Sequence, residues 1–122
     1  MRIGVEQAQE WARHAAMAAG ADERTATSLA KATVAAELAG HASVGFAHLL
    51  DYLDGFATGR IAGSAQPDCQ YPVPTTIQVD AKAGIGQLGF DITFEKLVNA
   101  AQQYGVGLFS QHNSYTVGEL GD

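Results

Sequence analysis

Cysteine, proline and basic residues are scarce in this chain of 122 residues. Its single cysteine, Cys69, cannot form an internal disulfide or a cysteine-based zinc site. The sequence therefore predicts a reducing, cytoplasmic setting. Seven basic side chains stand against thirteen acidic ones, a net charge of −6. Because nucleic-acid binders are normally basic, this balance disfavours that class.

Long hydrophobic runs are also missing. No apolar stretch is long enough to span a membrane, and residues 1–20 carry no continuous apolar region typical of a signal peptide. The hydrophobic fraction of 47% and the charged fraction of 16% are nevertheless those of a globular protein. The length favours one domain with a real core.

Residues 1–61 are predicted to form a helical segment. Apolar residues recur at helical spacing in three stretches, and Gly20, Gly40 and Gly59 are expected to end them. Asp22 is a good N-cap for the second helix. The third is predicted to bury a stripe at positions 46, 49, 50, 53 and 56.

The pattern changes after residue 61. Residues 62–74 contain three prolines and read as an extended linker. Residues 75–80 alternate like a strand, residues 90–104 predict a helix with an apolar face at positions 90, 94, 97, 98 and 101, and residues 106–110 predict a second strand. Residues 75–122 therefore suggest the start of an α/β nucleotide-binding domain that is truncated or completed by a partner, because two strands are marginal alone.

Residues 84–89 match the pattern G-x-G-x-x-G, which can bind a pyrophosphate at a helix N-terminus. The alternative is a glycine turn that packs a helix on a strand. The residues preceding the motif are helical rather than β-α-β, and no acidic residue follows the second strand to bind a ribose. These features favour the packing turn.

Two further segments carry side chains suited to chemistry. Ser43 can cap the third helix or face an anionic substrate, and His48 and Tyr52 share a helix face at i, i+4. Their alternative roles are a surface histidine near Asp51 and a half-buried aromatic residue. His112 follows a strand, where ligands bind in α/β folds, but it can equally be a solvated loop histidine. No pair of histidines has a metal-ligand spacing.

Taken together, residues 40–52 and 105–118 resemble the N-terminal part of the malate/L-lactate dehydrogenase-type family, which includes ureidoglycolate dehydrogenase-like and cyclic-imine reductase members. Residues 55–61 and the Gly-x-Gly-Gln turn near residues 80–87 extend the resemblance over nearly the whole chain.

The resemblance implies a homodimeric NAD- or NADP-dependent oxidoreductase with a non-Rossmann α/β fold, which transfers hydride to a 2-oxo acid. It places Ser43, His48 and Tyr52 at the substrate. It places Asn113, Ser114 and Gly118 at the cofactor.

Three positions depart from the family pattern. Val44 and Thr116 stand where the family carries histidine, and His48 stands where it carries arginine. Valine cannot exchange a proton, and threonine is no general acid near neutral pH, so His112 is the local stand-in acid. A protonated histidine can bind a carboxylate, without the bidentate fork of arginine. Two hypotheses stay open: a truncated or divergent dehydrogenase, and a non-catalytic interaction or regulatory module on the same scaffold.

Overall fold

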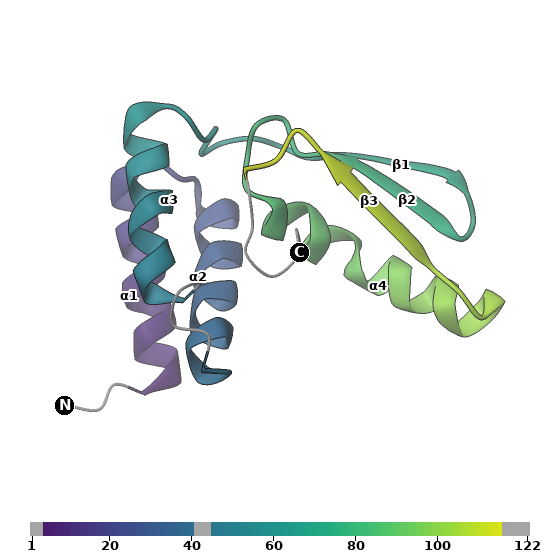
Figure 1. The fold of residues 1–122 in the computed structure, drawn as a ribbon, viewed down its shortest axis with the longest axis horizontal. Helices are drawn as coiled ribbons and strands as arrows, with labels where there is room; N and C mark the ends of the chain where they lie inside the picture. The colour runs from purple at the N-terminus through teal and green to yellow at the C-terminus, as the bar shows by residue number, and fades with distance from the viewer. Residues whose placement is uncertain (1–3, 41–44, 116–122) are drawn as a thin grey trace.

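A computed structural model describes residues 4–40 and 45–115 of the chain. Their elements, in chain order, are α1 (Val5–Ala19), α2 (Glu23–Leu38), α3 (Phe46–Thr58), β1 (Asp68–Val73), β2 (Thr76–Asp80), α4 (Gly86–Tyr104) and β3 (Leu108–His112). Figure 1 shows α1, α2 and α3 side by side at one end, and the sheet lying over α4 at the other. The expected α/β class is confirmed.

The ends of several helices follow local sequence signals. The side chain of Asp22 accepts a hydrogen bond of 2.8 Å from the backbone N–H of Thr25, so Asp22 caps α2 as predicted. Gly59 and Gly105 follow α3 and α4 with φ of +83° and +81°, a left-handed conformation that favours glycine. These signals are local, which is why the sequence alone predicts them.

The start of α3 differs from the prediction. Ser43 was a candidate cap for this helix, with substrate contact as its alternative role, but the cap position is Gly45. The backbone N–H of Phe46 instead donates a hydrogen bond of 2.9 Å to Oε1 of Glu37, which comes from α2. The predicted cap was wrong because a carboxylate of the neighbouring helix satisfies the first amide. Ser43 itself lies outside the described residues.

The buried faces of α3 and α4 are rotated from the predicted stripes. Leu49 and Phe56 are buried as expected, but Leu50 is 65% exposed and Tyr52 takes its place on the inner face. On α4, Phe94 is 49% exposed, whereas the small residues Gly86, Gly89, Thr93 and Ala100 are buried. Small residues face inward because α4 lies close to the sheet, and large apolar side chains flank that contact.

Residues 62–74, predicted as an extended linker, contain strand β1. This strand pairs with β2 in antiparallel orientation, with a register irregularity between Gln70 and Val73. Strands β2 and β3 pair in parallel, as the β-α-β prediction required. Within the described residues, the sheet thus has three strands in the order β1-β2-β3 rather than two. Of the three prolines in this stretch, only Pro72 lies in β1, and an edge strand tolerates its missing N–H.

The sheet has one covered and one open face. Ile77 and Val79 point toward α4 and are buried, whereas Gln78 between them is exposed. The register places Asp80 beside His112 on the open face, in line with Gln78 and Ser110. The open face is therefore mostly polar.

One hydrophobic core joins the two ends of the molecule. It contains buried residues of α1, α2 and α3, together with Ile61, Ile85 and Leu88. Ile85 and Leu88 belong to the turn into α4 and its first turn. The core therefore fixes the N-terminal end of α4 against α2, and Gln87 links it to Tyr52 of α3.

Candidate functional site

Tyr52 on α3 is the buried centre of a polar cluster. Only 2% of the residue is exposed. Side chains from α3, α4 and the segment after β3 contact it. Burial raises the pKa of the Tyr52 hydroxyl above its usual value, and a hydrogen bond from Gln87 acts in the opposite direction. Tyr52 is therefore a neutral group near pH 7.

His48 lies one helical turn before Tyr52, and the two rings meet edge to face with centroids 5.1 Å apart. Its Nδ1 is 3.5 Å from Oδ2 of Asp51, and its side chain is 24% exposed. Its other ring nitrogen, Nε2, is buried and has no hydrogen-bond partner. The shared face and the contact with Asp51, both expected from spacing, are confirmed.

Gln87 belongs to the first turn of α4. Its Nε2 donates a hydrogen bond of 3.0 Å to the Tyr52 hydroxyl, whereas its Oε1 is buried without a partner. The sequence pattern pointed to the glycines around Gln87 rather than to Gln87 itself. The Gln87 side chain is what connects α4 to Tyr52.

Tyr115 approaches Tyr52 from the segment after β3. The two rings lie 5.1 Å apart at 64°. Backbone hydrogen bonds hold this segment in parallel with the turn into α4: Ala83 N–H donates to the carbonyl of Asn113, and Tyr115 N–H donates to the carbonyl of Gly84. The structure therefore brings the start of the predicted cofactor loop against α3.

Asn113 and His112 contact Asp80 rather than Tyr52. Nδ2 of Asn113 donates a hydrogen bond of 3.2 Å to Oδ1 of Asp80, and Nε2 of His112 is 3.9 Å from Oδ2 of the same carboxylate. The backbone N–H of Lys82, which also donates to Asp80, is the main reason that the pKa of Asp80 lies below its usual value. The His112 side chain is 73% exposed on the open face of the sheet. The structure therefore does not bring the stand-in acid to Tyr52. Ser114 is exposed.

The glycine motif at residues 84–89 lies in a closely packed turn. A Cβ on Gly84 would lie 2.9 Å from the Cβ of Ala65, and one on Gly89 would lie 2.8 Å from Cγ1 of Val79. The close approach of neighbouring protein atoms therefore requires glycine at both positions. Gln111, whose Nε2 donates to the carbonyl of Gly86 at 3.0 Å, also packs there. This close helix–strand contact agrees with the packing interpretation of the motif.

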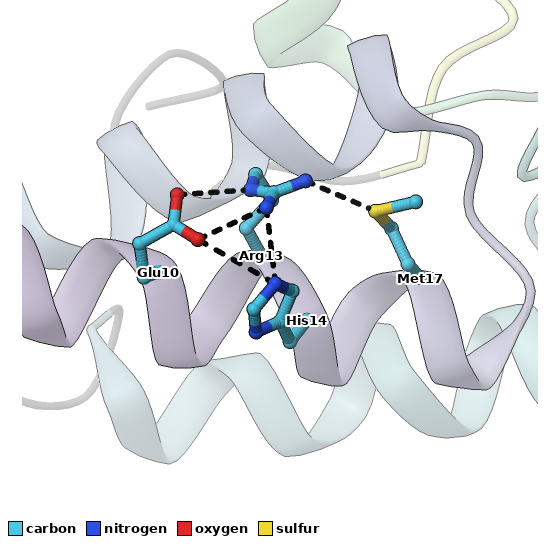
Figure 2. Close-up of polar contacts among 4 residues, drawn as sticks. All are labelled: Glu10, Arg13, His14 and Met17. Atoms are coloured by element: carbon cyan, nitrogen blue, oxygen red, sulfur yellow. Dashed lines mark hydrogen bonds and ion pairs between the residues drawn. The ribbon is translucent and has the colours of Figure 1, made fainter.

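A second polar cluster lies on the surface of α1 (Figure 2). The guanidinium of Arg13 donates two hydrogen bonds to the Glu10 carboxylate, of 2.9 and 3.2 Å, and lies 3.0 Å from Nε2 of His14 and 3.3 Å from Sδ of Met17. The hydrogen bond from Arg13 lowers the pKa of Glu10. Because these side chains are exposed to solvent, the network contributes little to the stability of the fold. Among residues 4–40 and 45–115, no group of three potential ligands could hold a metal ion.

Gln87 and Tyr115 were not among the site residues predicted from the sequence. A signal for Gln87 was present in the Gly-x-Gly-Gln turn, and Tyr115 lies inside the loop that was selected. Only the tertiary structure shows that both side chains contact Tyr52. Val44, Thr116 and Gly118, like Ser43, lie outside the described residues. In the part of the chain that the structure covers, no helix is both long and apolar enough to cross a membrane.

Known proteins resemble this chain over most of its length. It is 26% identical over 115 residues to the Delta(1)-pyrroline-2-carboxylate reductase of Ancylobacter novellus, covering 94% of this chain and 34% of that protein. It is 24% identical over 102 residues to hydroxycarboxylate dehydrogenase B of Escherichia coli, covering 84% of this chain and 28% of that one. The chain thus spans about a third of the length of these relatives.

Solved structures show the same fold. The delta1-piperideine-2-carboxylate reductase of Pseudomonas syringae pvar. tomato superposes with a TM-score of 0.88 at 24% identity, over 93% of this chain and 34% of the other. Malate dehydrogenase from Pyrococcus horikoshii gives 0.83 at 23% identity, over 97% and 34%. The family model of malate/L-lactate dehydrogenase matches residues 3–122. The chain therefore belongs to the malate/L-lactate dehydrogenase family.

Proposed function

We propose that this chain is part of an NAD(P)-dependent oxidoreductase that interconverts a small 2-oxo or cyclic imino acid and its reduced form. The observation that carries the proposal is the meeting of His48, Gln87 and Tyr115 around the buried Tyr52, in a chain of this family. The names of its relatives cover both hydroxy acids and cyclic imino acids. The reduced nicotinamide would supply the hydride, and this cluster would hold the substrate.

The proposed roles follow the family resemblance. Ser43, His48 and Tyr52 would bind the substrate, and Asn113, Ser114 and Gly118 would line the nicotinamide. The glycines of residues 84–89 serve close helix–strand packing, and we propose the non-Rossmann fold that the family resemblance implies. We also propose a cytoplasmic homodimer. Sedimentation equilibrium of the purified chain tests the dimer, and fractionation of cells tests the location.

The activity test measures NADH and NADPH oxidation by the full chain with pyruvate, oxaloacetate and cyclic imino acids. We expect turnover with at least one substrate, reduced by Tyr52→Phe because this variant removes the hydroxyl that Gln87 binds. Tyr71→Phe, at an exposed position of β1, is the matched control. The catalytic proposal fails if no acid supports oxidation and no NAD(P)H fluorescence change accompanies binding.

A second candidate function is a non-catalytic interaction or regulatory module. Val44 and Thr116 replace the family histidines, and His112 contacts Asp80 on the open face instead of Tyr52. The double variant Val44→His with Thr116→His separates the two functions. Activity that appears only in this variant would favour the module, whereas activity of the unaltered chain would exclude it.

A further inference from the structure

A cavity lies between the C-terminal half of α4 and the edge strand β1. Its volume is about 410 Å³, within the usual range of small-molecule sites. Its lining includes the side chains of Tyr71, Val73, Ile77, Lys96, Gln103 and Tyr104. Lys96 lies roughly 14 Å along the helix from Gln87, the residue that binds Tyr52. The cavity is therefore separate from the candidate site at Tyr52.

The cavity exists because one helix does not cover three strands. A helix with its side chains is about 10 Å wide, and neighbouring strands lie about 4.8 Å apart, so a single helix covers roughly two of them. Helix α4 packs mainly on β2 and β3, and β1 is the strand at the edge (Figure 1). The side chains of β1 that line the cavity consequently stay partly uncovered, with Tyr71 44% and Val73 51% exposed.

Lys96 gives this cavity a positive charge. Its Nζ lies 4.2 Å from the centroid of the Tyr71 ring, so the ring positions the ammonium group. Among the residues that the structure describes, no carboxylate pairs with Lys96, and none of those that line the cavity is acidic. This positive charge is local, because the chain as a whole carries a net charge of −6. One ammonium group balances one negative charge, so it suits a carboxylate better than a doubly charged phosphate.

The other walls of the cavity suit a flat apolar body. Tyr104 and Val73 are half-exposed there, and aromatic rings attract other rings in offset or edge-to-face geometry. Asn99 and Gln103 follow Lys96 on the same face of α4, at i+3 and i+7. Their side-chain amides can hydrogen-bond to a polar group on the ligand. The cavity thus combines one cation, an aromatic wall and two amides.

We propose that the cavity between β1 and α4 binds small aromatic carboxylates, with the carboxylate at Lys96 and the ring against Tyr104. Tyr71 acts through Lys96, since its ring holds the ammonium group in place. The inference goes beyond the proposed function, because it concerns a second site that does not include Tyr52.

The experiment uses three probes that share a benzene ring and nearly the same shape but differ in charge: benzoate, benzamide and benzamidine. Two-dimensional amide NMR of the full chain at low salt measures the Kd of each. We expect benzoate to bind about fivefold more tightly than benzamide, near the upper value for a solvent-exposed ion pair, and benzamidine to bind more weakly than both. Added salt should reduce this advantage, because salt screens exposed charges. The amide signals of Lys96 and Gln103 should shift, whereas that of Gln87 should not.

Variants assign the preference to the ammonium group. Lys96→Gln should bind benzoate and benzamide equally, whereas Lys96→Arg, which keeps the charge, should retain the preference for benzoate. Lys82→Gln, at another exposed lysine, is the matched control and should behave like the unaltered chain. Tyr71→Phe keeps the ring that positions Lys96, and Tyr52→Phe lies outside the cavity, so both should also retain the preference. Lys96 is exposed, so its substitution should leave the fold intact, which circular dichroism checks.

The outcomes separate this inference from the proposed function. Equal binding of benzoate and benzamide, or a preference that persists in Lys96→Gln, overturns the role of the ammonium group and with it the inference. Absence of benzoate binding overturns it as well. Signal shifts at Gln87 without shifts at Lys96 and Gln103 would place benzoate at the candidate site instead. None of these results bears on NAD(P)H oxidation, which is measured separately and decides the proposed function.

Discussion

The helical end and the sheet end of this molecule bury their surfaces in different ways. Helices α1, α2 and α3 pack small and aliphatic side chains against one another, with Ala12, Ala16 and Ala26 fully buried. The sheet buries only the face that α4 covers (Figure 1). Its open face carries polar side chains. Tyr52 lies where the two ends meet, since Gln87 and Tyr115 both reach it. The candidate site therefore depends on both ends being folded and correctly joined.

The largest effect is expected in the helical core. Leu29 on α2 is 1% exposed, and Leu29→Ala should destabilise the chain by about 3 kcal/mol through lost burial and a residual cavity. Leu38→Ala on the same helix, where the side chain is 69% exposed, should change stability by less than about 0.5 kcal/mol. Urea unfolding of the two variants measures the difference. Similar losses would mean that the helices do not share the packed core described above.

Substitution of two glycines compares how rigidly the two ends are packed. A Cβ at Gly63 would clash with backbone atoms of Gly20 and Ala21, whereas one at Gly89 would meet the side chains of Val79 and Gln111. We expect Gly63→Ala to cost about 3 kcal/mol and Gly89→Ala about 1–2 kcal/mol, because side chains move more easily than backbone. Thermal unfolding of both variants tests this order. The reverse order would show that the α4–sheet contact is the more rigid of the two.

The stability that the open face of the sheet contributes should decrease at acidic pH. Because the pKa of Asp80 is depressed in the folded chain, its contribution to stability is present above the ordinary value of 3.8 and is lost as the pH falls below it. Asp80→Asn removes this contribution, so stability should fall less steeply with acid than in the unaltered chain. Denaturant titrations at several pH values measure the slope. Asp68→Asn, on the paired strand, is the control; an equal change of slope in both variants would contradict the role of Asp80.

The smallest effect on stability is expected from ionisation of Tyr52 at alkaline pH. Since burial raises its pKa in the folded chain, the stabilisation that comes from the neutral phenol is complete below pH 10.0 and is lost as the pH rises above that value. Spectrophotometric titration should show one tyrosine ionising later than the others, and that component should vanish in Tyr52→Phe. Its persistence in this variant would assign the late ionisation to another tyrosine.

Much of the fold could be predicted because its signals are local. The cap at Asp22 and the glycine stops depend on a few neighbouring residues, and each element of the β-α-β unit has its own local pattern. Strand β1 escaped prediction because its proline-containing sequence resembles a linker, and only pairing with β2 makes it a strand. The inner faces of α3 and α4 were misassigned because periodicity does not show which residues a neighbouring element will cover.

The sequence by itself determined the family, the helical first half and the residue types available for chemistry, since these follow from residue identity and spacing. Tertiary structure alone decided which of those residues share a site. His48 and His112 look alike in sequence, yet one contacts Tyr52 and the other Asp80 on the open face. The physical reason is that neighbouring residues of a strand point to opposite faces, so Gln111 faces α4 and His112 does not.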